Sequence, residues 1–266
     1  MVIRNYHRAT SLSDAWRALE ANPENVVFGG GTWLKQGKRS IDTMVDLSDL
    51  GLDRIDVQNG SVTIGAMTTL RTVEKDPAVL GLASGMLSVA VAKIMGVNFR
   101  NLATIGGSVM GKFAFSDVIT PLLALDATLV FYRRGRVSLE DFLQEGKQAR
   151  DLLMRVEIPA RDGKGFFKKV SQTAVDFAIL NVAVHRADRT RIAIGARPGV
   201  SALAKQAMAH LDEAGNRKED LFEAVARIAV DELSFSDNHQ AKRAYRQALA
   251  FEYVKRGLKE VCGDGN

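Results

Sequence analysis

The chain has 266 residues, of which 46% are hydrophobic and 25% charged, the composition of a soluble globular protein with room for one or two domains. Its formal net charge is only +5 and 7% of its residues are aromatic, so we do not expect the basic, aromatic surface of a nucleic-acid-binding protein. A single cysteine, Cys262, excludes an internal disulfide or an iron–sulfur cluster held by this chain, and the four histidines lack metal-ligand spacing.

The first subdomain is expected over about residues 1–55. It lacks a signal-peptide core, and no apolar run in the chain is long enough to span a membrane, so we expect a cytoplasmic protein. Ser11-Leu12-Ser13-Asp14 resembles a capping box that begins an amphipathic helix. Strands are expected at 26–28 and 44–47, and a glycine loop, Gly29-Gly30-Gly31-Thr32, follows the first of them.

A second subdomain is expected over residues 56–160. It begins with a strand at 61–65, and the apolar residues of 80–94 predict one buried helix. A second glycine loop follows, Thr104-Ile105-Gly106-Gly107-Ser108, and Ser116-Asp117 predicts the N-cap of another helix. Further strands are expected at 128–132, 136–138 and 152–158.

Residues 159–165 combine proline, glycine and charges, and predict a linker between domains 1–160 and 161–266. The second domain is predicted to be α+β. Its strands are expected at 166–170, 179–186 and 191–196, and its helices at 202–211, 218–230 and 238–261.

The two glycine loops suit a phosphate ligand. Glycine lets backbone N–H groups approach an anion closely, and threonine or serine adds a hydroxyl donor. A lone glycine triplet is equally typical of a tight turn, but two such loops suggest two arms that grip one pyrophosphate. The GxGxxG pattern of a Rossmann fold is absent.

With both loops in place, the sequence resembles the FAD-binding medium subunits of the molybdenum hydroxylases, such as those of xanthine dehydrogenase and carbon monoxide dehydrogenase. The resemblance implies an α+β protein with a two-subdomain PCMH/VAO-type FAD-binding domain and a C-terminal α+β domain like that of the carbon monoxide dehydrogenase flavoprotein. It covers nearly the full length and rests on Gly29–Leu34, Ile64–Leu70, Val97–Ser108, Ser116-Asp117, Pro121, Leu122–Ala127, Phe167–Ser171 and Ala178–Val184.

The resemblance also implies FAD as cofactor and a set of residues that bind it. The expected FAD-binding residues are Gly29, Gly30, Gly31, Thr32, Trp33, Thr104, Ile105, Gly106, Gly107, Ser108, Asp117 and Lys168.

Some of these residues have a second interpretation. Asp117 suits cofactor hydroxyls but also a helix cap, and Lys168 matches a lysine near the flavin ring, although Lys169 is one register away. Trp33 replaces a small or polar residue, so it either stacks on a cofactor ring or crowds the cleft. Arg100 and Lys112 flank the second loop and either offset the pyrophosphate charge or lie on the surface.

The function implied by the resemblance is that of an electron-transfer flavoprotein, an oxidoreductase subunit without a catalytic side chain of its own. The implied partners are a molybdopterin-binding large subunit and a [2Fe–2S] small subunit, with NAD⁺ or another acceptor receiving the electrons. One alternative is a self-sufficient FAD oxidoreductase, for which no catalytic Ser, Tyr or Glu stands out. The other is a flavin-free scaffold subunit, which Trp33 favours.

Overall fold

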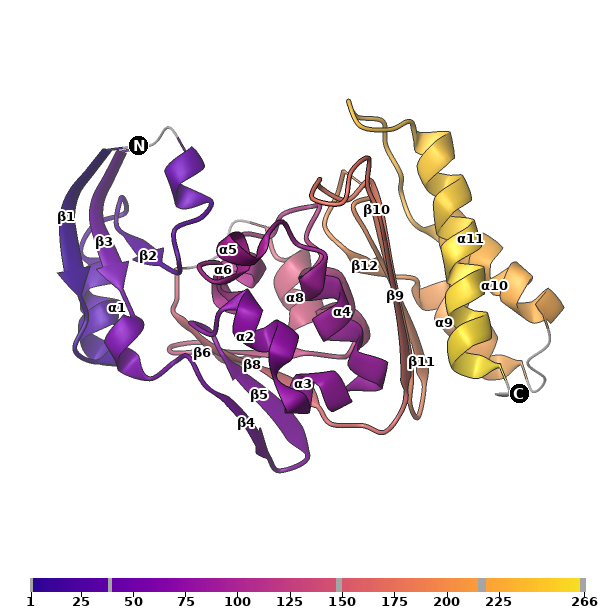
Figure 1. The fold of residues 1–266 in the computed structure, drawn as a ribbon, viewed down its shortest axis with the longest axis horizontal. Coiled ribbons are helices and arrows are strands. Elements are labelled where there is room, and N and C mark those ends of the chain that lie inside the picture. Colours follow the sequence, from indigo (N-terminus) through magenta and orange to yellow (C-terminus); the bar gives the residue numbers. More distant parts are fainter. Residues whose placement is uncertain (1, 38–39, 147–149, 215–218, 264–266) are drawn as a thin grey trace.

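The computed structural model describes residues 2–37, 40–146, 150–214 and 219–263. Within these ranges the chain forms three sheets in succession: an N-terminal sheet, a central sheet covered by helices, and a C-terminal sheet with three helices on its outer side (Figure 1). None of the helices in these ranges combines the length and the apolar character needed to cross a membrane.

The N-terminal subdomain is a small parallel sheet of order β1-β3-β2, formed by β1 (Val2–Arg8), β3 (Ser40–Asp46) and β2 (Val26–Phe28). The helix α1 (Leu12–Glu20) packs beside β3, and the Ser11 hydroxyl accepts a hydrogen bond from the Asp14 amide at 3.1 Å. The cap by Ser11 is therefore confirmed, but the Asp14 carboxylate accepts from the Thr10 amide at 3.0 Å and does not complete the capping box. The strand predicted at 26–28 is confirmed, and the strand predicted at 44–47 begins earlier, at Ser40, and ends at Asp46. β1 was not expected, because its residues are almost all exposed and give no apolar alternation.

The central subdomain has an antiparallel sheet of order β4-β5-β8-β6-β7. Its strands are β4 (Ile55–Gln58), β5 (Ser61–Gly65), β6 (Thr128–Phe131), β7 (Gly135–Ser138) and β8 (Leu153–Pro159). Among the described residues, the short helices that accompany it are α2 (Leu70–Lys75), α3 (Pro77–Gly81), α4 (Met86–Ala92), α5 (Val97–Arg100), α6 (Ile105–Met110), α7 (Ile119–Ala124) and α8 (Leu139–Gln144). The strands match the predictions at 61–65, 128–132, 136–138 and 152–158.

The prediction of a single helix over 80–94 is wrong. Ala83, Ser84 and Gly85 all have positive φ (45°, 58° and 73°), so the chain leaves the right-handed helix before α4 begins at Met86. Apolar residues continue through the break because both sides of it are buried, and the hydropathy pattern therefore hides it. In the described part of this half, 3₁₀ turns are formed by η1 (Leu34–Gln36) and η2 (Ser48–Leu50), while η3 (Ala83–Gly85) is the positive-φ turn at the break.

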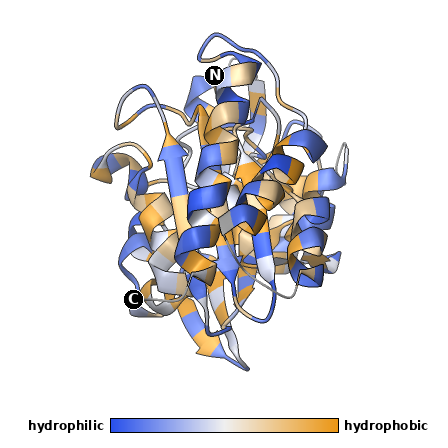
Figure 2. Ribbon diagram, turned by 90° about the vertical axis from the view of Figure 1, so that its right-hand side faces the viewer, coloured by the Kyte–Doolittle hydropathy of each residue, from blue (hydrophilic) through white to orange (hydrophobic). Residues whose placement is uncertain are grey.

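The C-terminal sheet is antiparallel, of order β12-β11-β10-β9, and consists of β9 (Lys164–Val170), β10 (Leu180–Arg186), β11 (Thr190–Gly195) and β12 (Ala202–Leu203). Its outer side carries α9 (Lys205–Glu213), α10 (Glu219–Glu232) and α11 (Arg243–Cys262). Figure 2 views the molecule from the side of these helices and shows hydrophilic and hydrophobic residues alternating along them, as expected for helices with one buried face.

Three boundaries in this half differ from expectation. The linker is shorter than 159–165, because β9 already begins at Lys164. The helix expected from 202 begins at Lys205, since Ala202 and Leu203 pair with β11. The helix expected from 238 begins at Arg243, because the Asn238 carboxamide accepts hydrogen bonds from two following amides and holds a turn. Lys218, the expected first residue of another helix, lies outside the described residues.

The inner face of the C-terminal sheet packs on the central helices. α7 contacts both β10 and β11, and α4 contacts β9. Ala183 of β10 and Ala193 of β11 belong to the same buried cluster as Leu122 of α7. This packing brings β9 and β10 next to the segment that carries Asp117.

Candidate cofactor-binding cleft

A cleft of about 910 Å³ lies where the three parts of the chain meet. That volume is within the range of pockets that bury organic cofactors. Of the residues expected to bind FAD, the lining includes Gly29, Gly31, Thr32, Trp33, Thr104, Gly106, Gly107, Ser108 and Asp117. Gly30, Ile105 and Lys168 do not line it.

The two glycine loops are in direct contact. The Thr104 hydroxyl accepts a hydrogen bond from the Gly107 amide at 3.1 Å, where it caps α6, and donates to the Gly29 carbonyl at 3.4 Å. One hydroxyl group therefore joins the first loop to the second. The sequence predicted both loops in one site, but not this bond between them.

Two glycines are required by the close approach of backbones. Gly30 has φ +74°, and a Cβ there would lie 1.8 Å from the Leu102 carbonyl oxygen. A Cβ on Gly106 would lie 2.6 Å from the Ala66 carbonyl oxygen. Gly30 thus does not line the cleft, but its missing side chain lets the first loop approach the second.

The two loops differ in the hydrogen bonds that remain available. In the second loop the amides of Ile105 and Gly106 donate to the carbonyls of Thr68 and Ala66, at 3.0 and 2.9 Å. In the first loop the four amides of residues 30–33 donate no hydrogen bond within the described part of the chain. Unpartnered amides beside a cleft are what an anion needs, so the first loop has the free donors that a phosphate site requires.

Five aromatic rings form a cluster at the cleft, and all five line it. Trp33 is in its centre, with ring centroids 5.0 Å from Phe113, 5.7 Å from Phe115 and 5.6 Å from Phe177. Phe99 completes the aromatic cluster at 6.5 Å from Trp33. The cluster gives the cleft a broad apolar surface of the kind on which planar rings pack.

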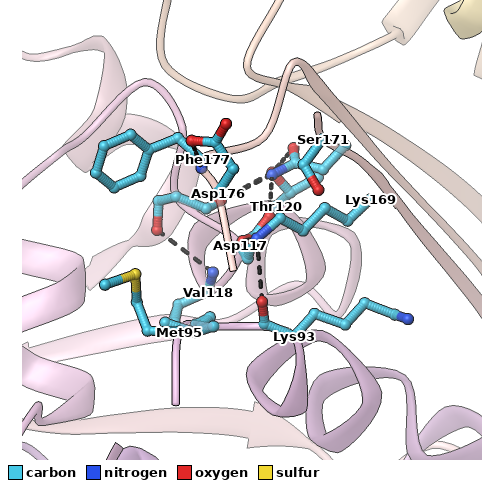
Figure 3. Close-up of polar contacts among 12 residues, drawn as sticks. Lys93, Met95, Asp117, Val118, Thr120, Lys169, Ser171, Asp176 and Phe177 are labelled. Atoms are coloured by element: carbon cyan, nitrogen blue, oxygen red, sulfur yellow. Dashed lines mark hydrogen bonds and ion pairs between the residues drawn. The ribbon is translucent and has the colours of Figure 1, made fainter. Parts of the chain in front are cut away.

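Asp117 and Lys169 form a buried ion pair in the wall of the cleft. Their side chains are 6% and 4% exposed, and Lys169 Nζ lies 2.9 Å from Asp117 Oδ2. Lys169 also donates to the Lys93 carbonyl at 3.0 Å, and Figure 3 shows it between these two acceptors. Burial raises the pKa of Asp117, and the charge of Lys169 acts in the opposite direction.

The helix cap expected from Ser116-Asp117 comes from Ser116 alone. Its hydroxyl accepts hydrogen bonds from the amides of Val118 and Ile119 at the start of α7. The Asp117 carboxylate is turned toward β9 and β10 instead, where Asn181 Nδ2 donates to its Oδ1 at 2.9 Å. This orientation leaves Asp117 at the cleft rather than at the helix end.

The lysine at the cleft is Lys169 and not Lys168. Successive side chains of a strand point to opposite faces, and Lys168 of β9 is exposed on the far face, with Nζ 5.4 Å from the Tyr253 ring centroid of α11. Strand alternation was the available signal, but it could not say which face meets the cleft.

The two other cations considered from the sequence are engaged elsewhere. Arg100 Nε lies 2.8 Å from Glu74 Oε2, and its guanidinium also donates to the carbonyls of Ile94 and Met95. Lys112 Nζ lies 4.3 Å from the ring centroid of Phe142 and donates to that residue's carbonyl. Neither lines the cleft. Within the ranges that the structure describes, no three His, Cys, Asp or Glu side chains are grouped to hold a metal ion.

Fold and cleft together define a class: a two-subdomain dinucleotide-binding protein with an added α+β domain. Residues 2–161 match the family described as the FAD binding domain in molybdopterin dehydrogenase, and residues 165–261 match the CO dehydrogenase flavoprotein C-terminal domain. The chain therefore belongs to the FAD-binding medium subunits of the molybdenum hydroxylases, which are oxidoreductase subunits, and FAD is its cofactor.

Similar proteins span nearly the same length. The chain is 26% identical to a glyceraldehyde dehydrogenase medium chain of Sulfolobus acidocaldarius, over 97% of this chain and 98% of that one. It is 25% identical to a putative xanthine dehydrogenase FAD-binding subunit of Escherichia coli, with 97% and 95% covered. The fold matches a chain of carbon monoxide dehydrogenase from Hydrogenophaga pseudoflava with a TM-score of 0.88 at 23% identity, covering 97% of both chains.

The residues of the cleft fit FAD. Unpartnered amides in the first loop suit its pyrophosphate, the aromatic cluster suits a planar ring, and the Asp117 carboxylate suits hydroxyl groups.

Proposed function

We propose that this chain is the electron-transfer subunit of a multi-subunit molybdenum hydroxylase. In this assignment FAD receives electrons from [2Fe–2S] clusters of a partner chain and passes them to NAD⁺ or another acceptor. The observation that carries the proposal is the cleft in which the first-loop amides, the aromatic cluster and the pair Asp117–Lys169 converge. Bound FAD supplies the capacity to take up and release electrons singly or in pairs.

The chain's own residues would bind and orient the cofactor. The amides of residues 30–33 would donate to the pyrophosphate, and Asp117 would accept hydrogen bonds from cofactor hydroxyls. Lys169 would keep a positive charge in the wall beside them, and the rings around Trp33 would exclude water. We also propose that the division at residue 160 separates the part that supplies the glycine loops from the part that supplies Lys169.

The partners proposed are a molybdopterin-binding large subunit and a [2Fe–2S] small subunit, in the cytoplasm. Two observations support them: similar proteins are named as a medium chain and as an FAD-binding subunit, and this chain has a single cysteine. A cluster with cysteine ligands would therefore be held by another chain.

The test is affinity purification of the tagged chain from its own cells, with mass spectrometry, metal analysis and a visible spectrum. We expect a flavin spectrum and two co-purified chains, one with molybdenum and one with iron. A lone flavoprotein that oxidises its own substrate would replace the proposal by the self-sufficient oxidoreductase. A complex whose chain takes up no flavin, even with added FAD, would replace it by the scaffold.

A further inference from the structure

Asn181 of β10 is fully buried behind the cleft and does not line it. Its Nδ2 donates to Asp117 Oδ1 at 2.9 Å and to the Ser116 carbonyl at 3.2 Å. A carboxamide nitrogen has two hydrogens, and both are used. Asn181 therefore reaches the cleft only through Asp117 and the segment that carries it.

The other end of the Asn181 side chain is held as firmly. Its Oδ1 accepts from the Thr120 hydroxyl at 2.7 Å. The same hydroxyl lies 3.4 Å from the Ser116 carbonyl, a longer contact than that with Asn181. Because a hydroxyl has one hydrogen and it is directed at Asn181, the contact of 2.6 Å between Thr120 and Ser201 is a donation from Ser201. The donors and acceptors around it thus fix which end of the carboxamide faces Asp117.

Gly195 of β11 provides the space for this arrangement. A Cβ there would lie 2.3 Å from Asn181 Oδ1, 2.4 Å from the Thr120 hydroxyl and 2.5 Å from the Ser201 hydroxyl. The three polar side chains thus meet where β11 has no side chain. The network is built from α7, β10, β11 and Ser201, and so joins the C-terminal sheet to the wall of the cleft.

We propose that Asn181 is a positioning residue for FAD: it holds Asp117 in one orientation, as a carboxylate, so that its remaining acceptor positions face the hydroxyls of the cofactor. This inference rests on the proposed placement of FAD against Asp117. It gives the C-terminal domain a part in cofactor binding beyond the charge of Lys169.

The charges around Asp117 determine how the loss of the Asn181 side chain would change its protonation. Lys169 faces it from β9, and Asp176 of the segment between β9 and β10 lines the same cleft. The side chain of Lys93, at the end of α4, points away from Asp117 in Figure 3, and its charge lowers the pKa of Asp117 less than that of Lys169 does. Burial raises the pKa of Asp117, and the hydrogen bond from Asn181 opposes that rise. Without Asn181 the carboxyl group would be protonated at a higher pH, and a protonated carboxyl group is a weaker acceptor for hydroxyls.

The test compares the full chain with Asn181→Leu and Asn181→Asp, using the dissociation constant of FAD measured by titration across pH. For Asn181→Leu we expect about a tenfold rise in Kd at neutral pH, and the pH below which binding weakens should move up by about one unit. Asn181→Asp keeps the shape but places an acceptor opposite Asp117, so it should weaken binding at least as much without a cavity. Thr190→Val removes a buried hydroxyl from the same sheet and is the matched control, with a Kd within about twofold of the unchanged chain.

The outcomes separate the inference from the proposed site. If Asp117→Asn leaves the Kd of FAD unchanged, the placement of FAD against Asp117 is wrong. If Asp117→Asn weakens binding while both folded Asn181 variants retain the original Kd and pH profile, only the role of Asn181 is overturned. An equal effect of Thr190→Val would also overturn it, because the effect would then come from the packing of the sheet.

Discussion

At the residue scale the strictest position is Gly30, which needs both a positive φ and the absence of a Cβ. We expect Gly30→Ala to destabilise the protein by about 3 kcal/mol or more, because the added carbon must push the first loop away from Leu102. Urea unfolding of the cofactor-free chain measures the change. Gly60→Ala is the matched control, since Gly60 has φ +71° but nothing within 4 Å of a built Cβ.

The control isolates the contact from the backbone conformation. Gly60→Ala should cost only about 1 kcal/mol, the penalty of a left-handed residue with a side chain. Equal costs at the two positions would show that the loops are not held together at Gly30.

The buried pair gives a second prediction at this scale. Lys169→Met leaves Asp117 without its cation, so we expect the free energy of unfolding to fall by about 3–5 kcal/mol at neutral pH. The control is Lys168→Met on the exposed face, which should lower it by less than about 0.5 kcal/mol. The pKa of Asp117 is raised in the folded chain and rises further without Lys169, so the folded state then binds the proton more tightly than the unfolded state.

The sign of the pH dependence follows. The penalty of Lys169→Met is fully present above the raised pKa of Asp117 and shrinks as pH falls through it. Unfolding of variant and original chain between about pH 8 and about pH 5 tests this. A penalty independent of pH would mean that Asp117 is not left as an uncompensated charge.

At the scale of elements, α6 and the first loop depend on one hydroxyl. Thr104→Val removes both the cap of α6 and the bond to Gly29, so we expect a loss of about 1 kcal/mol and a weaker affinity for FAD. Thr104→Ser retains the hydroxyl and should recover most of both. If Thr104→Ser is as damaging as Thr104→Val in unfolding and FAD titration, the methyl group matters and the hydroxyl does not.

The elements also show where sequence patterns lose information. The helix cap at Ser11 and most strands of the two antiparallel sheets were predictable, because caps and apolar alternation are local properties. The strands β4 and β12 were not predicted, and the residues of β12 were expected to begin a helix. The break at residues 83–85 was not, because apolar residues on both sides are buried by the same core. The choice between Lys168 and Lys169 was likewise open until the faces of β9 were assigned to α11 and to the cleft.

At the scale of the whole molecule, FAD should stabilise all parts that meet at the cleft. At about 100 times its Kd, FAD adds about 2.7 kcal/mol to the stability of the folded state, which corresponds to a rise in Tm of about 5–10 °C for a chain of this size. Differential scanning calorimetry of the cofactor-free chain measures the rise. Riboflavin lacks the pyrophosphate for which the first-loop amides are available, so at the same concentration it should raise the Tm far less.

An equal rise with riboflavin would show that the first loop does not contribute through its amides. The loops, the aromatic cluster and Asp117 come from distant parts of the sequence. The rise in Tm with FAD therefore also reports whether these parts form one binding site.

The sequence by itself determined both glycine loops and most of the strands, because glycine spacing and apolar alternation are encoded along the chain. Its resemblance to a known family added the α+β class and the FAD cofactor. Only the tertiary structure decided that Thr104 ties the loops together, that the first loop retains unpartnered amides, and that Lys169 and Asn181 hold Asp117. The physical reason is that these properties depend on which donors and acceptors have already found partners elsewhere in the fold. Which donor pairs with which acceptor is determined when α7, β9 and β10 pack together, and no local sequence pattern predicts it.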